Sequence, residues 1–194
     1  MERFIFNFSS KQPKKKFNVK HILGSKGANL AEMSRLGLSV PPGFTISTKV
    51  CDLFYKNKKK LPPFIIKSVK KELGLIEKAT KRRFGDQKSP LLISIRSGAR
   101  ISMPGMMDTI LNLGLNDKTV LALAKKTDNT RFAKDSYRRF IQMYSNVVMG
   151  VEAYNFEELI ENYKLTKGVL LDTDLGENDW DGLIKDFKEV VRSK

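Results

Sequence analysis

Residues 94–116, SIRSGARISMPGMMDTILNLGLN, decide the fold, because two short apolar runs flank a loop of small residues. The first run, Leu91–Ile95, leads directly into Arg96, and the second run spans Thr109–Leu113. Apolar runs bounded by Gly, Ser and Pro predict two strands joined by this loop. Small residues let backbone N–H groups approach an anion, and the guanidinium of Arg96 adds a permanently charged donor fork. The stretch therefore predicts a site for a polyanion such as the phosphates of a nucleotide.

A second glycine-rich segment, Gly24-Ser25-Lys26-Gly27, opens a predicted helix that ends near Leu36, with Gly37 at the C-cap position. Free N–H groups at a helix start favour an anion, and Lys26 adds positive charge. Taken alone, these four residues also fit a solvent-exposed lysine in a turn. The other upstream elements are a strand within 1–8, a lysine-rich connection at 9–20, a strand at 44–46, a helix capped by Ser47 or Thr48 and a helix from Pro62 to about Arg83.

Downstream of the hairpin the pattern predicts helices only. Asp117 is expected to cap a helix ending near Lys126, and Asn129 to cap the longest helix, which ends near Met149. Arg138-Arg139 on this helix are expected to be surface or inter-domain charges. The apolar face of the same helix is expected to consist of Phe132, Ser136, Phe140, Met143 and Val147.

The strands lie in the first two thirds of the chain and the last third is helical, which predicts the α+β class. We expect two domains, 1–116 and 117–194. Further helices are expected at 156–163 and 180–191, separated by an acidic, poorly patterned segment at about 168–179 that we expect to be mobile.

The net charge of +15 invites a nucleic-acid-binding interpretation. Its distribution argues against that class, because the 44 residues from 151 onward are net negative and Lys outnumbers Arg by 26 to 10. The lysine clusters also lack interleaved aromatic residues that could stack on bases. Solvated lysine faces are therefore favoured over a nucleic-acid partner.

Cys51 and His21 are the single cysteine and the single histidine. They exclude an internal disulfide framework and any multi-cysteine or multi-histidine metal site within this chain. Cys51 is expected to be a small core hydrophobe. No apolar window reaches the roughly 18 residues of a membrane span, and the N-terminus does not resemble a secretory signal. We therefore expect a cytoplasmic protein with no membrane partner.

Arg96 has two interpretations, a structural ion pair with a carboxylate such as Asp108 or a contact with a phosphate. A charged side chain at the end of an apolar strand is costly without an anion, which favours phosphate. Met106-Met107 are interpreted either as core residues or as an apolar wall beside a ligand. No acidic pair lies beside these motifs, so no metal ligand is assigned within the chain.

Three long segments resemble the pyruvate, phosphate dikinase family. They are KGANLAEMSRLGLSVPPGFTIST at 26–48, LLISIRSGARISMPGMMDTILNLGLND at 91–117 and RFAKDSYRRFIQMYSNVVMG at 131–150. The loop SMPGMMDT also separates the chain from related dikinases that use water, which typically carry an ASFAG-type loop. The resemblance is strong over about residues 20–165.

The resemblance implies the first subdomain of an ATP-grasp fold, with a small mixed or antiparallel sheet, followed by a helical insertion. It implies that Lys26 and Arg96 contact the phosphates of ATP and act in catalysis. It also implies that the loop containing Ser102, Met103 and Gly105 closes over those phosphates. The family converts ATP, phosphate and pyruvate into AMP, pyrophosphate and phosphoenolpyruvate, through a phosphohistidine on a separate domain.

Two departures from the family pattern are visible. Gly24-Ser25 stands where Gly-Gly is usual, a change between small residues. Family members are also several times longer, so the Mg²⁺ ligands, the phosphohistidine domain and the pyruvate-binding barrel are expected outside this chain. We expect the full-length enzyme to be a homodimer and the chain alone to be inactive. The alternatives are a non-catalytic binding or regulatory fragment and, less favoured, a basic nucleic-acid-binding domain.

Overall fold

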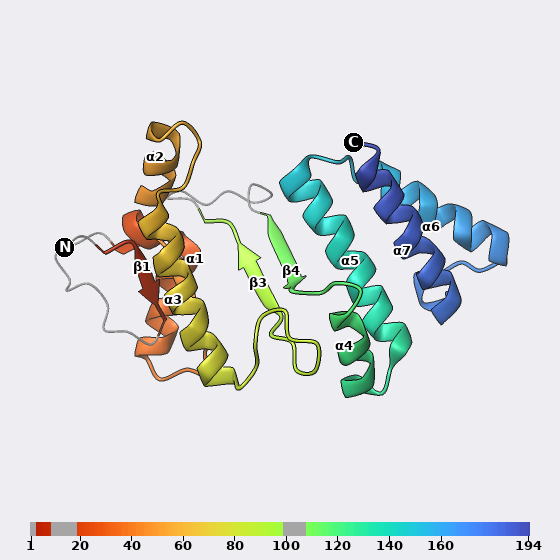
Figure 1. Ribbon diagram of the computed structural model, residues 1–194, viewed down its shortest axis with the longest axis horizontal. Coiled ribbons are helices and arrows are strands. Elements are labelled where there is room, and N and C mark those ends of the chain that lie inside the picture. Colours follow the sequence, from red (N-terminus) through yellow and green to blue (C-terminus); the bar gives the residue numbers. More distant parts are fainter. Residues whose placement is uncertain (1–2, 9–18, 99–107) are drawn as a thin grey trace. The chain divides into compact units, whose positions relative to one another are not determined.

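The computed structural model describes residues 3–8, 19–98 and 108–194, which form two compact units (Figure 1). The first unit contains residues 3–8, 19–81 and 97–98, and the second contains residues 82–96 and 108–194. Helices and small antiparallel sheets occur together, so the α+β class is confirmed. The boundary between these units differs from the expected division into 1–116 and 117–194. Both strands that flank the loop at 97–107 belong to the same unit as the helices that follow them.

The first unit is built on a two-stranded sheet. Strand β1, Ile5–Asn7, pairs antiparallel with β2, Phe44–Ile46, and Ile5 lies opposite Ile46. Helix α1, Val19–Arg35, contacts β2. The strands at 1–8 and 44–46 are therefore confirmed. The core between the sheet and α1 consists of Phe6, Leu23, Ala28 and Ala31.

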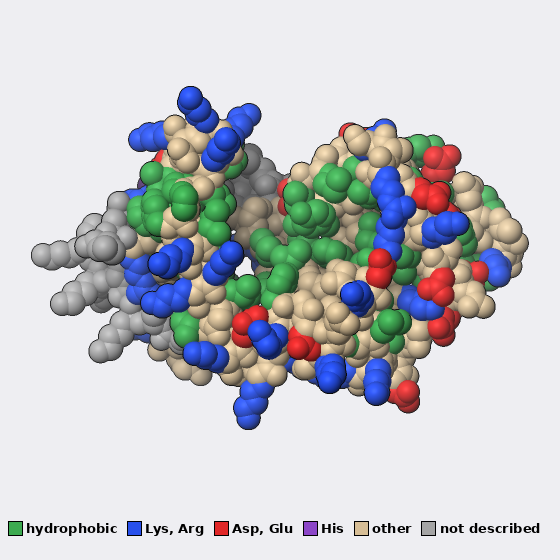
Figure 2. Space-filling model, in the orientation of Figure 1, with side chains coloured by type: hydrophobic (Ala, Val, Ile, Leu, Met, Phe, Trp, Pro, Cys, Tyr) green, Lys and Arg blue, Asp and Glu red, His purple; other side chains and the backbone are tan. Residues whose placement is uncertain are grey.

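Two further helices complete the first unit, α2 at Lys49–Lys56 and α3 at Pro63–Thr80. Pro63 occupies the first turn of α3, where its missing N–H costs no hydrogen bond. The buried face of α3 carries Ile65 and Ile76, and basic side chains gather over α2 and α3 on the outside (Figure 2). The exposed lysines of α3 are Lys67, Lys70, Lys71 and Lys78.

The second unit begins with the predicted hairpin. Strand β3, Ile93–Arg96, pairs antiparallel with β4, Thr109–Leu113, and Arg96 lies opposite Thr109. The strand–loop–strand prediction is confirmed for the strands. The helices of this unit are α4 at Thr119–Thr127, α5 at Thr130–Met149, α6 at Tyr154–Lys167 and α7 at Glu177–Arg192, with a short 3-10 helix, η1, at Asp172–Asp174.

The core of the second unit is packed between α5, α6 and α7. Trp180, Phe156 and Phe187 are fully buried, and the rings of Phe156 and Phe187 lie 4.8 Å apart between centroids in an edge-to-face arrangement. Aromatic pairs of this geometry stabilise a core by about 0.5–1.5 kcal/mol beyond their buried area. The helix expected at 180–191 is confirmed as α7, whose buried face carries Trp180, Leu183 and Phe187.

Of the two helix caps predicted downstream of the hairpin, one is confirmed. The Oδ1 atom of Asn129 accepts a hydrogen bond from the N–H of Phe132 at 2.8 Å, as expected for a side-chain N-cap. The prediction for Asp117 is wrong. The side chain of Asn116 accepts the N–H of Thr119 at 3.0 Å, and therefore Asn116 forms the turn that begins α4.

Asp117 instead joins the start of α4 to α5 and α7. Its carboxylate accepts hydrogen bonds from Lys188 and, at 3.2 Å, from the hydroxyl of Tyr137. The hydrogen bond from Lys188 is the main reason why the pKa of Asp117 lies below its ordinary value. Burial, together with the nearby Asp117 carboxylate, raises the pKa of Tyr137.

The buried face of α5 differs from the predicted one. Phe132 is 48% exposed, whereas Ala133, Tyr137 and Arg138 are buried. The prediction failed because Arg138 was placed outside on account of its charge, which rotated the apolar face by about one residue. The observed buried residues of α5 are Ala133, Ser136, Tyr137, Arg138, Ile141 and Ser145.

The acidic segment 168–179 makes specific contacts that argue against the expected mobility. Leu175 is only 1% exposed and belongs to the core. The guanidinium of Arg131 donates hydrogen bonds to the backbone carbonyls of Leu175 and Asp172, at 3.0 and 3.1 Å. An arginine from α5 therefore fixes a segment that has no apolar periodicity of its own.

Cys51 is exposed, so the expectation that it fills the core is wrong. It lies on α2, where Val50 is the buried residue. Adjacent residues of a helix point in different directions, and only one of these two can face the core.

Candidate functional site

The glycine-rich segment at 24–27 forms a break within α1. Gly24 has φ 69° and ψ 168°, a backbone conformation outside the helical region that is open almost only to glycine. The predicted helix start at this segment therefore corresponds to a real start, that of the helical part after Gly24. The short helical stretch Val19–Leu23 before the break was not expected.

Thr48 fastens the stretch before the break. Its hydroxyl donates a hydrogen bond to the carbonyl oxygen of His21 at 2.5 Å, and its backbone N–H donates to the carbonyl oxygen of Ile22 at 2.9 Å. Thr48 lies between β2 and α2, so these two bonds tie the first turn of α1 to the end of the sheet.

Gly27 lies against β2 so closely that a side chain has no room. A Cβ atom at this position would lie 2.7 Å from Oγ1 and 2.8 Å from Cγ2 of Thr45. Contacts shorter than 3.0 Å force one of the partners to move. The glycine therefore allows the turn that carries Lys26 to pack directly on the sheet.

Lys26 follows the break and is half-buried. Among the residues that the structure describes, none forms an ion pair or hydrogen bond with its ammonium group. A half-buried cation at the start of a helical segment is suited to an anionic ligand, because the helix dipole and the ammonium attract the same charge.

Arg96 ends β3 and is exposed. No ion pair joins its guanidinium to Asp108, or to any other carboxylate in the described part of the chain. The choice between an ion pair and a phosphate contact for Arg96 therefore stays a prediction. Its five N–H donors suit the bidentate binding of a phosphate.

Three predicted site residues, Ser102, Met103 and Gly105, lie outside the described residues. Lys26 belongs to the first unit and Arg96 to the second, so the structure places each within its own unit. Their common contact with one ligand stays a prediction.

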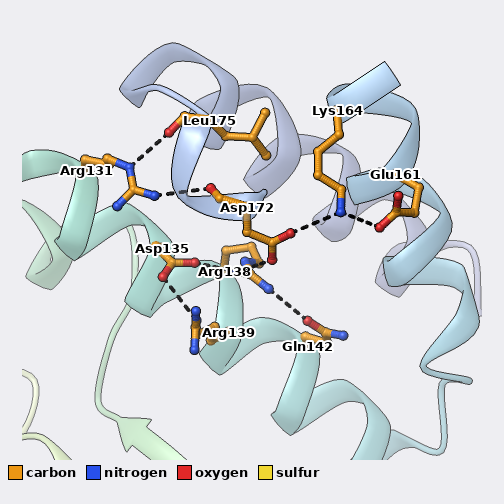
Figure 3. Close-up of polar contacts among 9 residues, drawn as sticks. All are labelled: Arg131, Asp135, Arg138, Arg139, Gln142, Glu161, Lys164, Asp172 and Leu175. Carbon is orange, nitrogen blue, oxygen red and sulfur yellow. Dashed lines mark hydrogen bonds and ion pairs between the residues drawn. The ribbon is translucent and has the colours of Figure 1, made fainter. Parts of the chain in front are cut away.

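A second polar cluster, which was not anticipated from the sequence, connects α5 with η1 and α6 (Figure 3). Arg138 is only 4% exposed, and its guanidinium contacts Asp135 at 2.5 Å and Asp172 at 3.6 Å. It also lies 4.7 Å above the ring of Trp180. Its partners lie within the second unit, so the prediction that Arg138 is a surface or inter-domain charge is wrong, whereas its neighbour Arg139 is exposed.

The cluster extends to α6 through Asp172. Lys164 contacts Asp172 at 3.4 Å and Glu161 at 2.5 Å, so one lysine links the 3-10 turn with its own helix. The hydrogen bond that Lys164 donates to Glu161 is the main reason why the pKa of Lys164 lies above its ordinary value. Each of these acidic groups already faces a cation, and the cluster is therefore an internal support rather than an open site.

An open groove of about 470 Å³ runs beside this cluster within the second unit. It is lined by side chains of α5, β4 and the segments that follow α5. The lining residues are Leu111, Arg138, Arg139, Gln142, Met143, Asn146, Val147, Ala153 and Asp172.

Within residues 3–8, 19–98 and 108–194, no group of three His, Cys, Asp or Glu side chains is arranged to hold a metal ion. In the same part of the chain, every helix is too short or too polar to cross a bilayer.

The sequence was compared with known proteins. A family model described as "Pyruvate phosphate dikinase, AMP/ATP-binding domain" matches residues 20–62, which include the break at Gly24, Lys26 and Thr48. Over 186 residues, 96% of this chain, it is 50% identical to the chloroplastic pyruvate, phosphate dikinase of Flaveria pringlei. Identity is 51% over 175 residues, or 90% of the chain, for Clostridium symbiosum, and 51% over 168 residues, or 87% of the chain, for Entamoeba histolytica. The matched regions make up only 19–20% of these relatives, so the chain spans about a fifth of their length.

Proposed function

The chain belongs to the pyruvate, phosphate dikinase family, and on this premise we propose that it supplies part of the ATP site of such an enzyme. The match of residues 20–62 to an AMP/ATP-binding domain supports the nucleotide. The observation that carries the proposal is the broken helix, because the break puts Lys26 at the start of a helical segment.

We propose that the first unit and the hairpin are the beginning of an ATP-grasp fold. The small antiparallel sheets and the glycine-dependent packing of Gly27 on Thr45 support this proposal.

In this proposal Lys26 and Arg96 each contact a phosphate of ATP. The ammonium acts as a mobile point charge, and the guanidinium fixes two phosphate oxygens at once. Both groups stabilise negative charge that develops as the phosphoryl group is transferred. The loop with Ser102, Met103 and Gly105 supplies backbone N–H donors and covers the phosphates.

The complete enzyme is proposed to convert ATP, phosphate and pyruvate into AMP, pyrophosphate and phosphoenolpyruvate, through a phosphohistidine on another domain. Mg²⁺ would neutralise phosphate charge in this reaction. We place the ligands of this ion outside the chain, as the family resemblance implies. A homodimeric assembly and a cytoplasmic location stay predictions, and the plant relatives are named chloroplastic.

ATP titration of the chain, monitored by two-dimensional NMR, tests the site. NMR is suitable because it can measure millimolar affinity. Lys26→Ala and Arg96→Ala should each weaken binding by about tenfold or more, the usual effect of losing a charge-assisted hydrogen bond. Lys67→Ala and Arg82→Ala are the matched controls, since both remove an exposed cation elsewhere. Wild-type affinity in both Lys26→Ala and Arg96→Ala would contradict the site assignment.

A chimera tests the activity. The aligned 175-residue segment of the Clostridium symbiosum dikinase is replaced by this chain, which is 51% identical to it. We expect the chimera to form phosphoenolpyruvate and Lys26→Ala within it to lose that activity, while Lys67→Ala keeps it. The chain alone should show no ATP/AMP exchange; measurable exchange would contradict our assignment of essential groups to the rest of the enzyme.

A further inference from the structure

Thr48 donates hydrogen bonds to two carbonyl oxygens of α1, those of His21 and Ile22. In a continuous α-helix the carbonyl of residue i accepts the N–H of residue i+4. The carbonyls of His21 and Ile22 would therefore accept the N–H groups of Ser25 and Lys26. Both carbonyls instead accept hydrogen bonds from Thr48, which lies 27 residues beyond His21.

The conformation of Gly24 agrees with this exchange of partners. Its φ of 69° and ψ of 168° interrupt the helix between the two carbonyls and the two N–H groups. A glycine tolerates this conformation, but it does not enforce it, because glycine is also compatible with a helix, although less favourably than alanine. Another group must therefore hold the helix open.

We propose that Thr48 is a positioning residue for the Lys26 turn, which it holds open by occupying the carbonyls of His21 and Ile22. The N–H groups of Ser25 and Lys26 are thereby kept available for a phosphate oxygen. This inference rests on the proposed function, because it assigns Thr48 a role at the same ATP site without contact with ATP.

Thr48 can take this role because its neighbour Ser47 serves α2. The hydroxyl oxygen of Ser47 accepts the N–H of Lys49 at 3.3 Å, whereas Thr48 makes no side-chain cap of α2. Ser47 is itself fixed to the first segment of the chain, since its N–H donates to the carbonyl of Phe4 at 2.8 Å. The two adjacent hydroxyl residues thus have different partners, and only that of Thr48 reaches α1.

Hydrogen exchange and ATP titration of the full chain test this role. Thr48→Val keeps the shape of the side chain and removes the hydroxyl, so the His21 carbonyl becomes free to accept Ser25. We expect exchange of the Ser25 amide to slow by about fivefold, as one added hydrogen bond of average strength predicts. ATP binding should weaken, and Thr48→Ser should restore both measurements because it restores the donor.

Gly24→Ala is an independent test of whether closing the break in α1 slows amide exchange and weakens ATP binding. Alanine is strained at φ 69°, so the variant should close the break and slow exchange at Ser25 and Lys26 even with Thr48 intact. Gly37→Ala is the matched control, because Gly37 also has a positive φ, 80°, but no atom lies within 4 Å of the position that its Cβ would occupy. It should cost stability without affecting the exchange of Ser25 or the affinity for ATP.

The outcomes separate this inference from the proposed function. If Lys26→Ala abolishes ATP binding while Thr48→Val leaves the Ser25 exchange and the affinity unchanged, the role of Thr48 is wrong and the site stands. If Lys26→Ala has no effect on ATP binding, the proposed site and the role of Thr48 are both wrong. Slower exchange and weaker binding in Thr48→Val, restored in Thr48→Ser, support the inference.

Discussion

Gly27 and Thr45 are in direct contact, and the space between them excludes even a methyl group. A Cβ atom on residue 27 would lie 2.7 Å from the hydroxyl oxygen of Thr45 and 3.2 Å from Cβ of Leu23. The turn that carries Lys26 is therefore held against β2 by backbone and not by a side chain. Substitution at this contact tests how closely the turn must approach the sheet.

Gly27→Ala should destabilise the chain by about 1–3 kcal/mol, the usual cost of overpacking a tight contact. Thr45→Ala removes both clashing atoms, and the double variant should recover most of the loss. Denaturant unfolding of the two single variants and the double variant measures the coupling between the positions. Additive losses would show that the two side chains do not compete for the same space.

Arg138 and Arg139 share the carboxylate of Asp135 but differ in burial. Arg138→Ala should lower the free energy of unfolding by about 3 kcal/mol, because it leaves a buried gap beside Trp180 and removes the nearest cation from the mostly buried Asp135. Arg139→Ala, which removes a side chain that is 60% exposed, should cost less than about 1 kcal/mol. Thermal or urea unfolding of both variants gives the comparison, and equal losses would contradict the burial of Arg138.

Asp179 stabilises the start of α7 in a pH-dependent way. Its carboxylate accepts the N–H of Gly176 at 2.9 Å and pairs with Lys167 at 3.0 Å. The hydrogen bond from Lys167, followed by that from Gly176, holds the pKa of Asp179 below its ordinary value of 3.8. Because the folded state has the lower pKa, this stabilisation is present above pH 3.8 and is lost as the pH falls through the folded-state pKa.

Asp179→Asn should therefore lower stability at pH 7 by about 1 kcal/mol, and the difference from wild type should shrink below about pH 4. Asp181→Asn, which alters an ion pair on the same helix with a 58% exposed side chain, is the control and should change little. Unfolding curves from pH 7 to pH 3 measure both. A loss that persists unchanged in acid would point to packing rather than charge.

Asn129 caps the longest helix, α5, through Phe132. Asn129→Ala should lower the free energy of unfolding by about 1 kcal/mol, whereas Asn129→Ser and Asn129→Asp, which keep an acceptor oxygen, should stay near wild type. Guanidinium unfolding of the three variants is sufficient. If all three lose the same amount, the stabilisation comes from another contact of the asparagine and not from the cap.

Local features of the chain were predictable where the signal lies within a few residues. The strands at 44–46 and 109–113, the cap at Asn129 and the helix at 180–191 depend on turn residues, capping groups and periodicity, and all are confirmed. The start of a helical segment at Gly24 is also local, because only glycine accepts its conformation. Family membership followed from three long segments of sequence and is supported by about 50% identity.

The sequence did not correctly predict features that depend on a partner far away in the chain. Arg138 was taken for a surface charge because its partners, Asp172 and Trp180, come from a later part of the chain. The segment 168–179 was expected to be mobile because its sequence is acidic and poorly patterned. The contacts that argue against this come from Arg131 on α5. Charge and apolar periodicity, the signals read along a sequence, carry no information on these pairings.

By itself, then, the sequence determined the order of most helices and strands, the family resemblance and which cations are candidates for the phosphates of ATP. Only the tertiary structure decided that Thr48 bonds to the carbonyls of His21 and Ile22 and that a buried arginine lies over Trp180. The physical reason is the range of the interactions. Backbone preferences act over a few residues, whereas a hydrogen bond across 27 residues exists only after the chain has folded.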